Sequence, residues 1–291
     1  MSEYVVELRN ITKLFPGVVA LKNMSIGIRP GEIHGLIGEN GAGKSTLIKV
    51  LTGVHSPEEG DIFVDGQKVV FKNPVQSREA GIACVYQELN IVKQLPVTDN
   101  IFMGRAVKKG LLLDYPRMYK EAAEALKTLG HPEIDVKMEC GKLGVGQQQM
   151  VEIAKAVSLD AKLIIMDEPT SSLGKEEIAQ LMDTVRGLKA KGVAILFASH
   201  KLEELFELCD RVTVMRDGEH IVTEDIGNMT EDSLITAMVG RTLDNLYPKE
   251  FGTKGDVWLR PRTSTRPASF TTSASRLTPA RSPALPDWWV P

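Results

Sequence analysis

The amino-acid sequence predicts an α/β fold built on a mainly parallel sheet, with an antiparallel β subdomain and a helical insertion. A glycine-rich stretch, residues 38–46, directly follows an apolar run at Ile33–Ile37. Two later runs, 163–166 and 194–198, are continuously apolar, as is typical of central parallel strands that are buried on both faces. A helical pattern over 175–191 joins these two runs into a βαβ unit.

The composition of the 291-residue chain is that of a soluble globular protein, with 43% apolar and 25% charged residues. Its net charge of −3 implies no general attraction to nucleic acid or to anionic lipid, so we expect no nucleic-acid partner. The cysteines, Cys84, Cys140 and Cys209, lack CxxC spacing, which argues against a disulfide framework or a zinc site. We recognise no signal peptide and no apolar run of the ~20 residues that span a bilayer, and expect a cytoplasmic chain.

Short strands are expected at the N-terminal end of the chain. Residues 5–8 and 24–28 flank a loop that contains Phe15-Pro16-Gly17. Residues 62–64 and 68–70 flank Asp65-Gly66, which is a strong hairpin signal. These segments do not alternate with helices, so we expect an antiparallel subdomain that wraps around the glycine-rich stretch.

The glycine-rich stretch fits the phosphate-loop pattern G-x-x-x-x-G-K-[ST], and the helix expected over 46–51 completes a strand–loop–helix context. Backbone N–H groups of such a loop turn inward on phosphate oxygens, and the helix N-terminus adds a partial positive charge. Lys44 can reach the β- and γ-phosphates, and the Ser45 hydroxyl can hold Mg²⁺. A glycine-rich turn that binds nothing is the alternative, but it would not require this Lys-Ser pair. We therefore predict that a nucleoside triphosphate is bound by the following loop residues: Gly38, Asn40, Gly41, Gly43, Lys44, Ser45 and Thr46.

A helical subdomain is expected over about 88–158. A short apolar run, 84–86, ends at Gln87, and helical periodicity then appears over 118–129. An amphipathic helix is expected over 147–158. Gln87 lies where a strand meets this insertion and can coordinate Mg²⁺ or the attacking water, although composition alone does not decide between this role and a structural one.

Two carboxylates follow the apolar run at 163–166. Asp167 is placed at the C-terminal end of a strand, where it can hold Mg²⁺. Glu168 can polarise a water for in-line attack on the γ-phosphate. The structural alternative is a strand followed by an acidic helix cap, since Pro169-Thr170-Ser171-Ser172 resembles a helix start. The phosphate loop upstream favours the catalytic interpretation.

Two further features are candidates for phosphate contacts. His200 follows the strand at 194–198, where a side chain can meet the γ-phosphate, although a lone histidine is usually a surface or core residue. Gly144, Gly146 and Gln147 belong to the stretch Leu143–Gln147, which opens the helix at 147–158 and forms an anion site of the kind found at helix N-termini. A plain capping turn would look similar.

The C-terminal region completes one domain, predicted at 1–247. We expect a strand at 211–215, a hairpin turn at Asp217-Gly218 and a last helix at 231–239. Residues 248–291 form a tail, and beyond Trp258 the chain lacks Lys, Glu, Asn, Gln and Ile and is rich in Pro, Ser, Thr and Arg. Such a composition is typical of a disordered extension.

Taken together, these motifs resemble the ATP-binding subunits of ABC transporters, whose order of motifs they follow over roughly residues 4 to 247. Within that family, residues 13–21, 145–156 and 238–241 look like the monosaccharide importers for ribose, galactose, arabinose and xylose. The resemblance implies a P-loop ATPase of the ABC type on the cytoplasmic face of the membrane. It implies permease subunits, a periplasmic or extracellular sugar-binding protein and a second cassette as partners. It also implies that Phe15 stacks on adenine, although a buried aromatic is an equally good reading of this residue.

Two residues depart from the family pattern. The signature of the family usually has a serine where this chain has Gly144, and that hydroxyl would touch the γ-phosphate held by the opposing cassette. Gly174 replaces an aspartate of the wider family, which sugar-type members often lack as well. Glu168 and His200 match the pattern, so the chain's own site has its catalytic residues.

Importers of this type normally carry two cassettes in one chain, and the tail suggests where the second one is. Tryptophan has only the codon TGG, so the bases that encode Asp287-Trp288-Trp289-Val290 are nearly fixed. In the frame whose codons combine the third base of one codon with the first two bases of the next, these bases must encode Leu-Val-Gly. With flanking Gly and Ala this resembles the start of a second phosphate loop. One hypothesis is therefore that residues from about Trp258 are a frameshifted reading of a second cassette, and the other is a genuine tail. Two alternatives to a transport ATPase are a soluble ABC clamp in translation or DNA repair and an ATP-binding but inactive truncated remnant.

Overall fold

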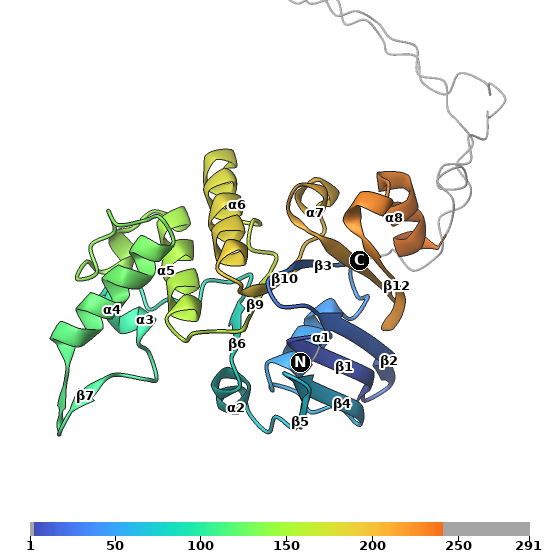
Figure 1. Ribbon diagram of the computed structural model, residues 1–291, viewed down its shortest axis with the longest axis horizontal. Helices are drawn as coiled ribbons and strands as arrows, with labels where there is room; N and C mark the ends of the chain where they lie inside the picture. The colour runs from blue at the N-terminus through green and yellow to red at the C-terminus, as the bar shows by residue number, and fades with distance from the viewer. Residues whose placement is uncertain (1–2, 241–291) are drawn as a thin grey trace, which may run out of the picture. The chain divides into compact units, whose positions relative to one another are not determined.

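The six-stranded sheet at the centre of the computed structural model is parallel except for its edge strand β12, in the order β12-β11-β3-β10-β9-β6 (Figure 1). The structure describes residues 3–240, so the predicted domain end at 247 and the interpretations of the tail lie outside the described residues. The strands of this sheet have the following bounds: β3 (Ile33–Ile37), β6 (Ile82–Val85), β9 (Leu163–Asp167), β10 (Ala194–Ala198), β11 (Arg211–Arg216) and β12 (Glu219–Asp225).

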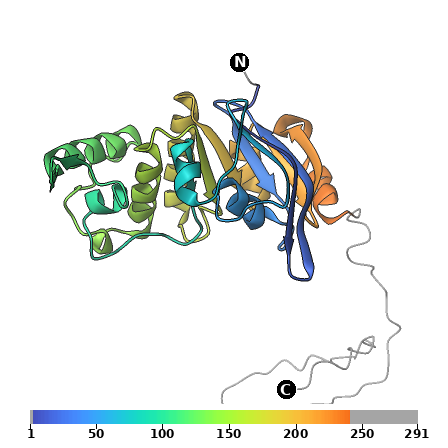
Figure 2. The ribbon, with the colours of Figure 1, turned by 90° about the horizontal axis from the view of Figure 1, so that it is seen from below.

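A second, antiparallel sheet has the order β2-β1-β4-β5. Its strands are β1 (Val6–Phe15), β2 (Val18–Ile28), β4 (Glu59–Val64) and β5 (Gln67–Val69). The helices are α1 (Lys44–Leu51), α2 (Pro74–Glu79), α3 (Val97–Ile101), α4 (Tyr115–Thr128), α5 (Val145–Val157), α6 (Lys175–Ala190), α7 (Leu202–Leu208) and α8 (Glu231–Val239). Figure 2 shows the helical insertion at one end and the antiparallel sheet alongside the central strands. Within residues 3–240, no helix combines the length and the apolar character needed to cross a bilayer.

The central strands are apolar throughout because both of their faces are covered. In β9, Ile164 and Met166 face the cluster formed with α5, α6 and α7, whereas Leu163 and Ile165 face α1 and the antiparallel sheet. All four side chains are fully buried. The continuous apolar runs therefore predicted these strands correctly, and the bounds of β3 and β10 agree with the prediction.

Strands β1 and β2 are much longer than the sequence indicated. Strands β1 and β2 were expected at 5–8 and 24–28, but they run on and pair until Phe15 meets Val18 across the turn at Pro16-Gly17. Gly17 has φ +80°, a left-handed conformation that favours glycine in this turn. Near the turn both strands carry exposed apolar side chains, such as Leu14, Val18 and Val19, so no alternation of buried apolar and exposed polar residues marks these parts as strands.

The helical insertion also contains a β-hairpin, which the sequence reading did not anticipate. Strands β7 (Lys108–Lys109) and β8 (Leu112–Leu113) lie between α3 and α4. Helix α5 begins at Val145, two residues before the predicted start, and α1 begins at Lys44 instead of residue 46. In both cases the apolar pattern marks the helix interior and not its first turn.

Buried polar side chains of the central sheet are connected by hydrogen bonds. His34 on β3 is fully buried; its Nδ1 lies 3.1 Å from Glu32 Oε1 and its Nε2 lies 2.7 Å from Thr213 Oγ1. Burial lowers the pKa of His34, while the contact with His34 helps to lower the pKa of Glu32 against the effect of burial. The imidazole is therefore neutral in the folded chain at pH 7.

We expect the free energy of unfolding to fall as the pH falls below about 6.5, because the unfolded chain then protonates a histidine that the folded chain keeps neutral. The slope contributed by His34 is at most about 1.4 kcal/mol per pH unit. Urea unfolding at several pH values measures it. A His34→Gln variant, which keeps a donor and an acceptor, should give a flatter profile below about pH 6.5. An unchanged profile would show that other groups cause the loss.

Candidate functional site

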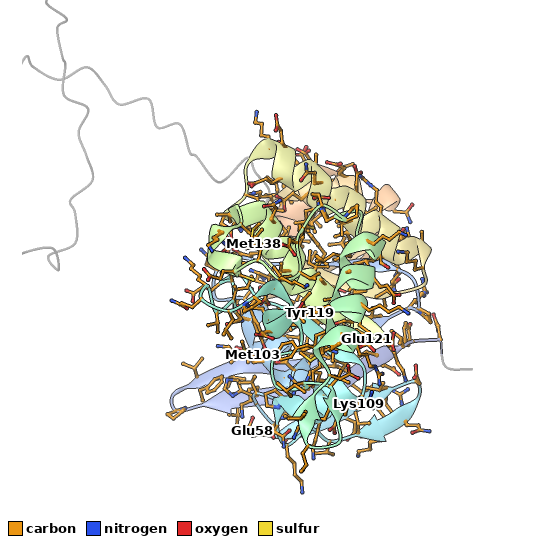
Figure 3. The ribbon with its side chains drawn as sticks, turned by 90° about the vertical axis from the view of Figure 1, so that its left-hand side faces the viewer. Glu58, Met103, Lys109, Tyr119, Glu121 and Met138 are labelled. Carbon is orange, nitrogen blue, oxygen red and sulfur yellow. The ribbon has the colours of Figure 1, made fainter. Side chains whose placement is uncertain are left out.

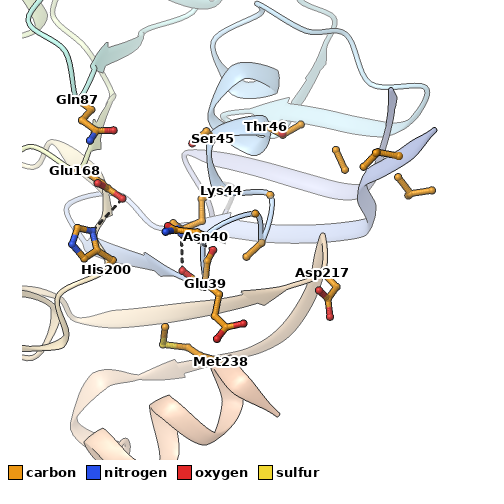
Figure 4. A pocket seen from close by; sticks show the side chains of 17 residues that line it. Glu39, Asn40, Lys44, Ser45, Thr46, Gln87, Glu168, His200, Asp217 and Met238 are labelled. Carbon is orange, nitrogen blue, oxygen red and sulfur yellow. Dashed lines mark hydrogen bonds and ion pairs between the residues drawn. The ribbon is translucent and has the colours of Figure 1, made fainter. Parts of the chain in front are cut away.

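A cavity of about 1140 Å³ lies where the phosphate loop meets the C-terminal ends of the central strands (Figure 4). Clefts at this edge of an open α/β sheet are the usual place for ligands. The lining residues come from β2, the phosphate loop, the ends of four strands and α8: Val18–Ala20, Gly38–Thr46, Gln87, Glu168, His200, Asp217 and Met238.

The phosphate loop needs its glycines for space and for backbone conformation. A Cβ atom on Gly38 would lie 2.4 Å from the carbonyl oxygen of Met215. Gly41 and Gly43 have φ +86° and +98°, and a Cβ on Gly43 would lie 2.8 Å from the carbonyl oxygen of Ala20. The loop is therefore held against β2 and the β11–β12 turn, with its N–H groups free to turn toward the cavity.

Lys44 is the buried cation of the cavity. Its ammonium donates to the carbonyl oxygens of Gly38 at 2.6 Å and Glu39 at 3.1 Å, so it lies across the loop (Figure 4). Burial lowers the pKa of Lys44, while Glu168 and Asp167 act in the opposite direction. A charged group that is already partly desolvated binds an anion more strongly than a surface lysine does.

The two carboxylates differ in their placement. Asp167 is the last residue of β9, and burial together with the charge of Glu168 raises its pKa. Glu168 leaves the strand with φ +46°, a conformation that is uncommon for a residue with a side chain, and its N–H donates to the carbonyl oxygen of Ala198 at 2.9 Å. Backbone strain of this kind concentrates at functional sites, and here it turns the Glu168 carboxylate toward the cavity.

His200 and Gln87 reach the same cavity from β10 and β6, the two strands that flank β9. The Nδ1 atom of His200 lies 3.2 Å from Glu168 Oε1, and the imidazole is about half exposed (Figure 4). Gln87 lies two residues beyond β6 and lines the cavity opposite the loop. The structure thus brings together Lys44, Ser45, Gln87, Glu168 and His200, as the sequence predicts.

The donor set near the loop suits a hard cation. Ser45, Gln87 and Asp167 offer a hydroxyl, an amide oxygen and a carboxylate, and Mg²⁺ prefers oxygen ligands. Burial and the charge of Glu168 raise the pKa of Asp167, while the charges of Lys44 and Lys49 act in the opposite direction. Over residues 3–240, no group of three or more His, Cys, Asp and Glu side chains could hold a metal on its own, so any cation here needs other oxygen donors as well.

Phe15 is not among the residues that line the cavity. Its ring lies at the end of β1, is 37% exposed and packs edge-on against His55 with 5.2 Å between the ring centroids. The wall nearest to it is formed by Val18, Val19 and Ala20 at the start of β2. Sequence reasoning did not select these three residues, since nothing in their pattern distinguishes them from other strand residues.

Gly144, Gly146 and Gln147 lie outside the cavity, at the N-terminus of α5. Gly144 is the N-cap residue, and its N–H lies 3.4 Å from the Gln147 side-chain oxygen. The Gly146 N–H donates to Glu177 Oε1 at 3.1 Å, and the Gly174 N–H donates to Glu177 Oε2 at 2.8 Å. Glu177 thus ties the start of α5 to the start of α6.

Glu177, Asp217 and Met238 were not selected from the sequence. The signal for Glu177 was its place three residues after Gly174, where a helix-capping carboxylate is expected. Asp217-Gly218 was correctly predicted as a turn, but its contact was not: the Gly218 N–H donates to the carbonyl oxygen of Ala42 in the phosphate loop at 3.1 Å. Met238 lies on α8, whose bounds agree with the prediction.

A second, smaller groove lies between α2, β6 and α5. Its lining includes Arg78, Tyr86, Asn90, Glu152 and Lys155. Burial raises the pKa of the Glu152 carboxyl and of the Tyr86 hydroxyl. Its lining includes Tyr86, the residue before Gln87, so the groove lies next to the point where the helical insertion begins.

Comparisons with known proteins agree with this geometry. A family described as ABC transporter matches residues 21–171. The chain is 47% identical to the ribose import ATP-binding protein RbsA 1 of Streptomyces coelicolor over 93% of its length and 54% of that protein. It is 46% identical to the galactose/methyl galactoside import ATP-binding protein MglA of Escherichia coli over 91% of its length and 52% of that protein. The chain spans about half the length of the curated relatives it matches.

Solved structures of similar shape are also ATP-binding cassettes. The ADP conformation of MJ1267, an ATP-binding cassette of an ABC transporter, aligns with a TM-score of 0.71 and 27% identity over 82% of this chain and 100% of that one. The dimeric structure of MJ0796, a bacterial ABC transporter cassette, aligns with a TM-score of 0.65 and 26% identity over 76% and 98% of the two chains.

Proposed function

Because this chain belongs to the ABC transporter family, we propose that it binds and hydrolyses ATP to energise the import of a monosaccharide across the cytoplasmic membrane. The observation that carries the proposal is the convergence of Lys44, Glu168 and His200 on one cavity beside the phosphate loop. The similarity to ribose and galactose import proteins supports a monosaccharide as the transported molecule.

Each of the residues at the cavity has a separate role in the proposed reaction. Lys44 and the N–H groups of the loop hold the phosphates, and the Glu168 carboxylate orients a water for attack on the γ-phosphate. His200, at 3.2 Å from Glu168, fixes that carboxylate and meets charge on the γ-phosphate. Ser45, Gln87 and Asp167 would hold Mg²⁺, which neutralises phosphate charge when it is bound.

A complete site needs a second cassette. The N-terminus of α5, with Gly144, Gly146 and Gln147, lies outside the chain's own cavity and would contact the γ-phosphate of an opposing cassette. The dimeric form of the similar MJ0796 cassette supports such pairing. Gly144 contributes no hydroxyl there, and the Gly146 N–H already donates to Glu177 Oε1, so the contact would depend on the remaining N–H groups of the first turn of α5.

The groove between α2 and α5 is the proposed contact with a permease. It adjoins Gln87, and residues 87–103 lead from the cavity into the helical insertion. A permease segment in this groove would therefore touch the elements that hold Gln87 and α5. The chain would act at the cytoplasmic face of the membrane, with a periplasmic or extracellular sugar-binding protein on the other side.

Phe15 is the proposed adenine contact, and Phe15→Leu is expected to weaken ATP binding. Stacking of a base on an aromatic ring contributes about 1–3 kcal/mol, equivalent to roughly 5- to 150-fold in Kd. Equilibrium titration with a fluorescent ATP analogue measures the change. Phe63→Leu on β4 is the matched control, because Phe63 stacks against Arg9 and does not line the cavity. An unchanged Kd in Phe15→Leu would leave Val18–Ala20 as the adenine contact.

Reconstitution tests the transport role. The chain is combined with a purified monosaccharide permease in vesicles, and ATP hydrolysis is measured with and without the sugar-loaded binding protein. The proposal predicts that hydrolysis rises when ribose, galactose or xylose is supplied with its binding protein. If the rate of hydrolysis does not change with any of the three sugars and its binding protein, the role in import is contradicted. The proposed ATPase activity would not be affected by that result.

A further inference from the structure

The β7–β8 hairpin exposes three consecutive leucines. Leu111 is fully exposed, and Leu112 and Leu113 are 77% and 44% exposed. Lys108 pairs with Leu113 and Lys109 with Leu112 in the short ladder. The two lysines are exposed as well, so apolar and positively charged side chains share the tip of the hairpin.

The base of the hairpin is held firmly, so its tip has a defined direction. The Asp114 N–H donates to the carbonyl oxygen of Val107 at 2.9 Å, closing the hairpin. Asp114 is also the N-cap of α4, where its carboxylate accepts from the Arg117 N–H at 3.2 Å. Val107 packs against the core cluster of the insertion. Gly110 has φ +67° and allows the tight turn before Leu111.

The hairpin and α2 extend toward the same end of the molecule, the lower end of Figure 1. Figure 3 shows Lys109 at this end of the helical insertion and Met138 toward the other. Helix α2 borders the groove proposed for the permease and itself exposes Val75, which is 47% exposed. The face that would receive a permease is therefore flanked by apolar side chains that the described residues do not cover.

We propose that the β7–β8 hairpin contacts the surface of an anionic lipid bilayer, with Lys108 and Lys109 on the headgroups and the leucines at the edge of the acyl region. A lysine keeps its ammonium in a polar layer while its stem lies along apolar surface, which matches the boundary of a bilayer. Lysines are depleted in protein–protein interfaces, so this combination fits lipid better than a protein partner. Anionic headgroups attract juxtamembrane lysines, and leucines add apolar burial.

The net charge of −3 does not oppose this contact. Charges separated by more than about 8 Å are largely screened at physiological ionic strength, so the lysines at the tip act locally. The net charge predicts no general attraction to anionic lipid, but the hairpin places its two positive charges at one protruding point. The contact needs no nucleotide and therefore does not depend on the proposed ATPase activity.

Vesicle flotation of the full chain, without a permease, tests the proposal. The chain is mixed with phosphatidylcholine vesicles that either contain or lack phosphatidylglycerol. We expect binding to the anionic vesicles that weakens with added salt, and much less binding to phosphatidylcholine alone. The double substitution L111S/L112S should weaken binding at least about tenfold, since two exposed leucines would lose their apolar burial. Lys108→Glu together with Lys109→Glu should weaken it by a similar factor.

Met138→Ser is the matched control. Met138 is an exposed apolar residue of the same insertion, 38% exposed and distant from Lys109 in Figure 3, and should bind vesicles like the parent chain. Circular dichroism and ATP binding show whether each variant is folded. The proposal is wrong if the parent chain does not float with anionic vesicles, or if the leucine and control variants bind equally. It is also wrong if the hairpin variants lose only binding to a detergent-solubilised permease, since the occupant would then be protein.

Discussion

Replacing Glu168 by glutamine is expected to lower the steady-state rate of ATP hydrolysis by roughly 100- to 10,000-fold, because an amide cannot polarise the attacking water as a carboxylate does. The substitution keeps the size of the side chain and its hydrogen bond with His200. It also removes one of two adjacent negative charges near the phosphates. ATP affinity should therefore stay equal or rise, which separates catalysis from binding.

Glu124→Gln provides the control for Glu168→Gln. Glu124 is an exposed residue of α4 and lies outside the cavity, so its replacement should leave the rate unchanged. Phosphate release measures the rate, and nucleotide titration measures the affinity. If Glu168→Gln kept more than a tenth of the parent activity, the general base would have to be another residue.

Replacing Lys44 by alanine is expected to weaken ATP binding by about 2–5 kcal/mol, roughly 30-fold to more than 1,000-fold in Kd. Lys44 is buried and directed across the phosphate loop, so no other side chain can take the place of its charge. Isothermal titration with ATP in the presence of Mg²⁺ measures the loss.

Lys49→Ala is the matched control for Lys44→Ala. Lys49 lies on the same helix, α1, but it is exposed and does not line the cavity. Equal losses in the two variants would mean that only the net charge of the region matters, and would contradict the role assigned to Lys44.

The long buried strands and helices could be predicted because their apolar pattern is set by burial. Strand β10, in which every residue is buried, has the predicted bounds, and helix α6 begins at the predicted Lys175. The short helices α2, α3 and α7 were not predicted, since five to seven residues carry too little periodicity to be distinguished from loops. The β7–β8 hairpin was missed for the same reason, because each of its strands has two residues.

The candidate site was more predictable than the fold around it. Glu168 and His200 each follow a buried parallel strand, and the C-terminal ends of such strands meet at one edge of a sheet. Glu177 could not be assigned its contact in this way, because its bond to the Gly146 N–H depends on how two helices pack. Phe15 illustrates the same limit, since its distance from the cavity depends on the register of β1 and β2.

The most direct test of the proposed function is the steady-state rate of ATP hydrolysis as a function of the concentration of the chain, with Mg²⁺ present and no permease. If two cassettes pair over two nucleotides, the rate will rise more steeply than in proportion to concentration, and Glu168→Gln will abolish it. Activity that stays at the level of Glu168→Gln at every concentration, while ATP still binds, would contradict the claim that this chain forms a working pair with itself.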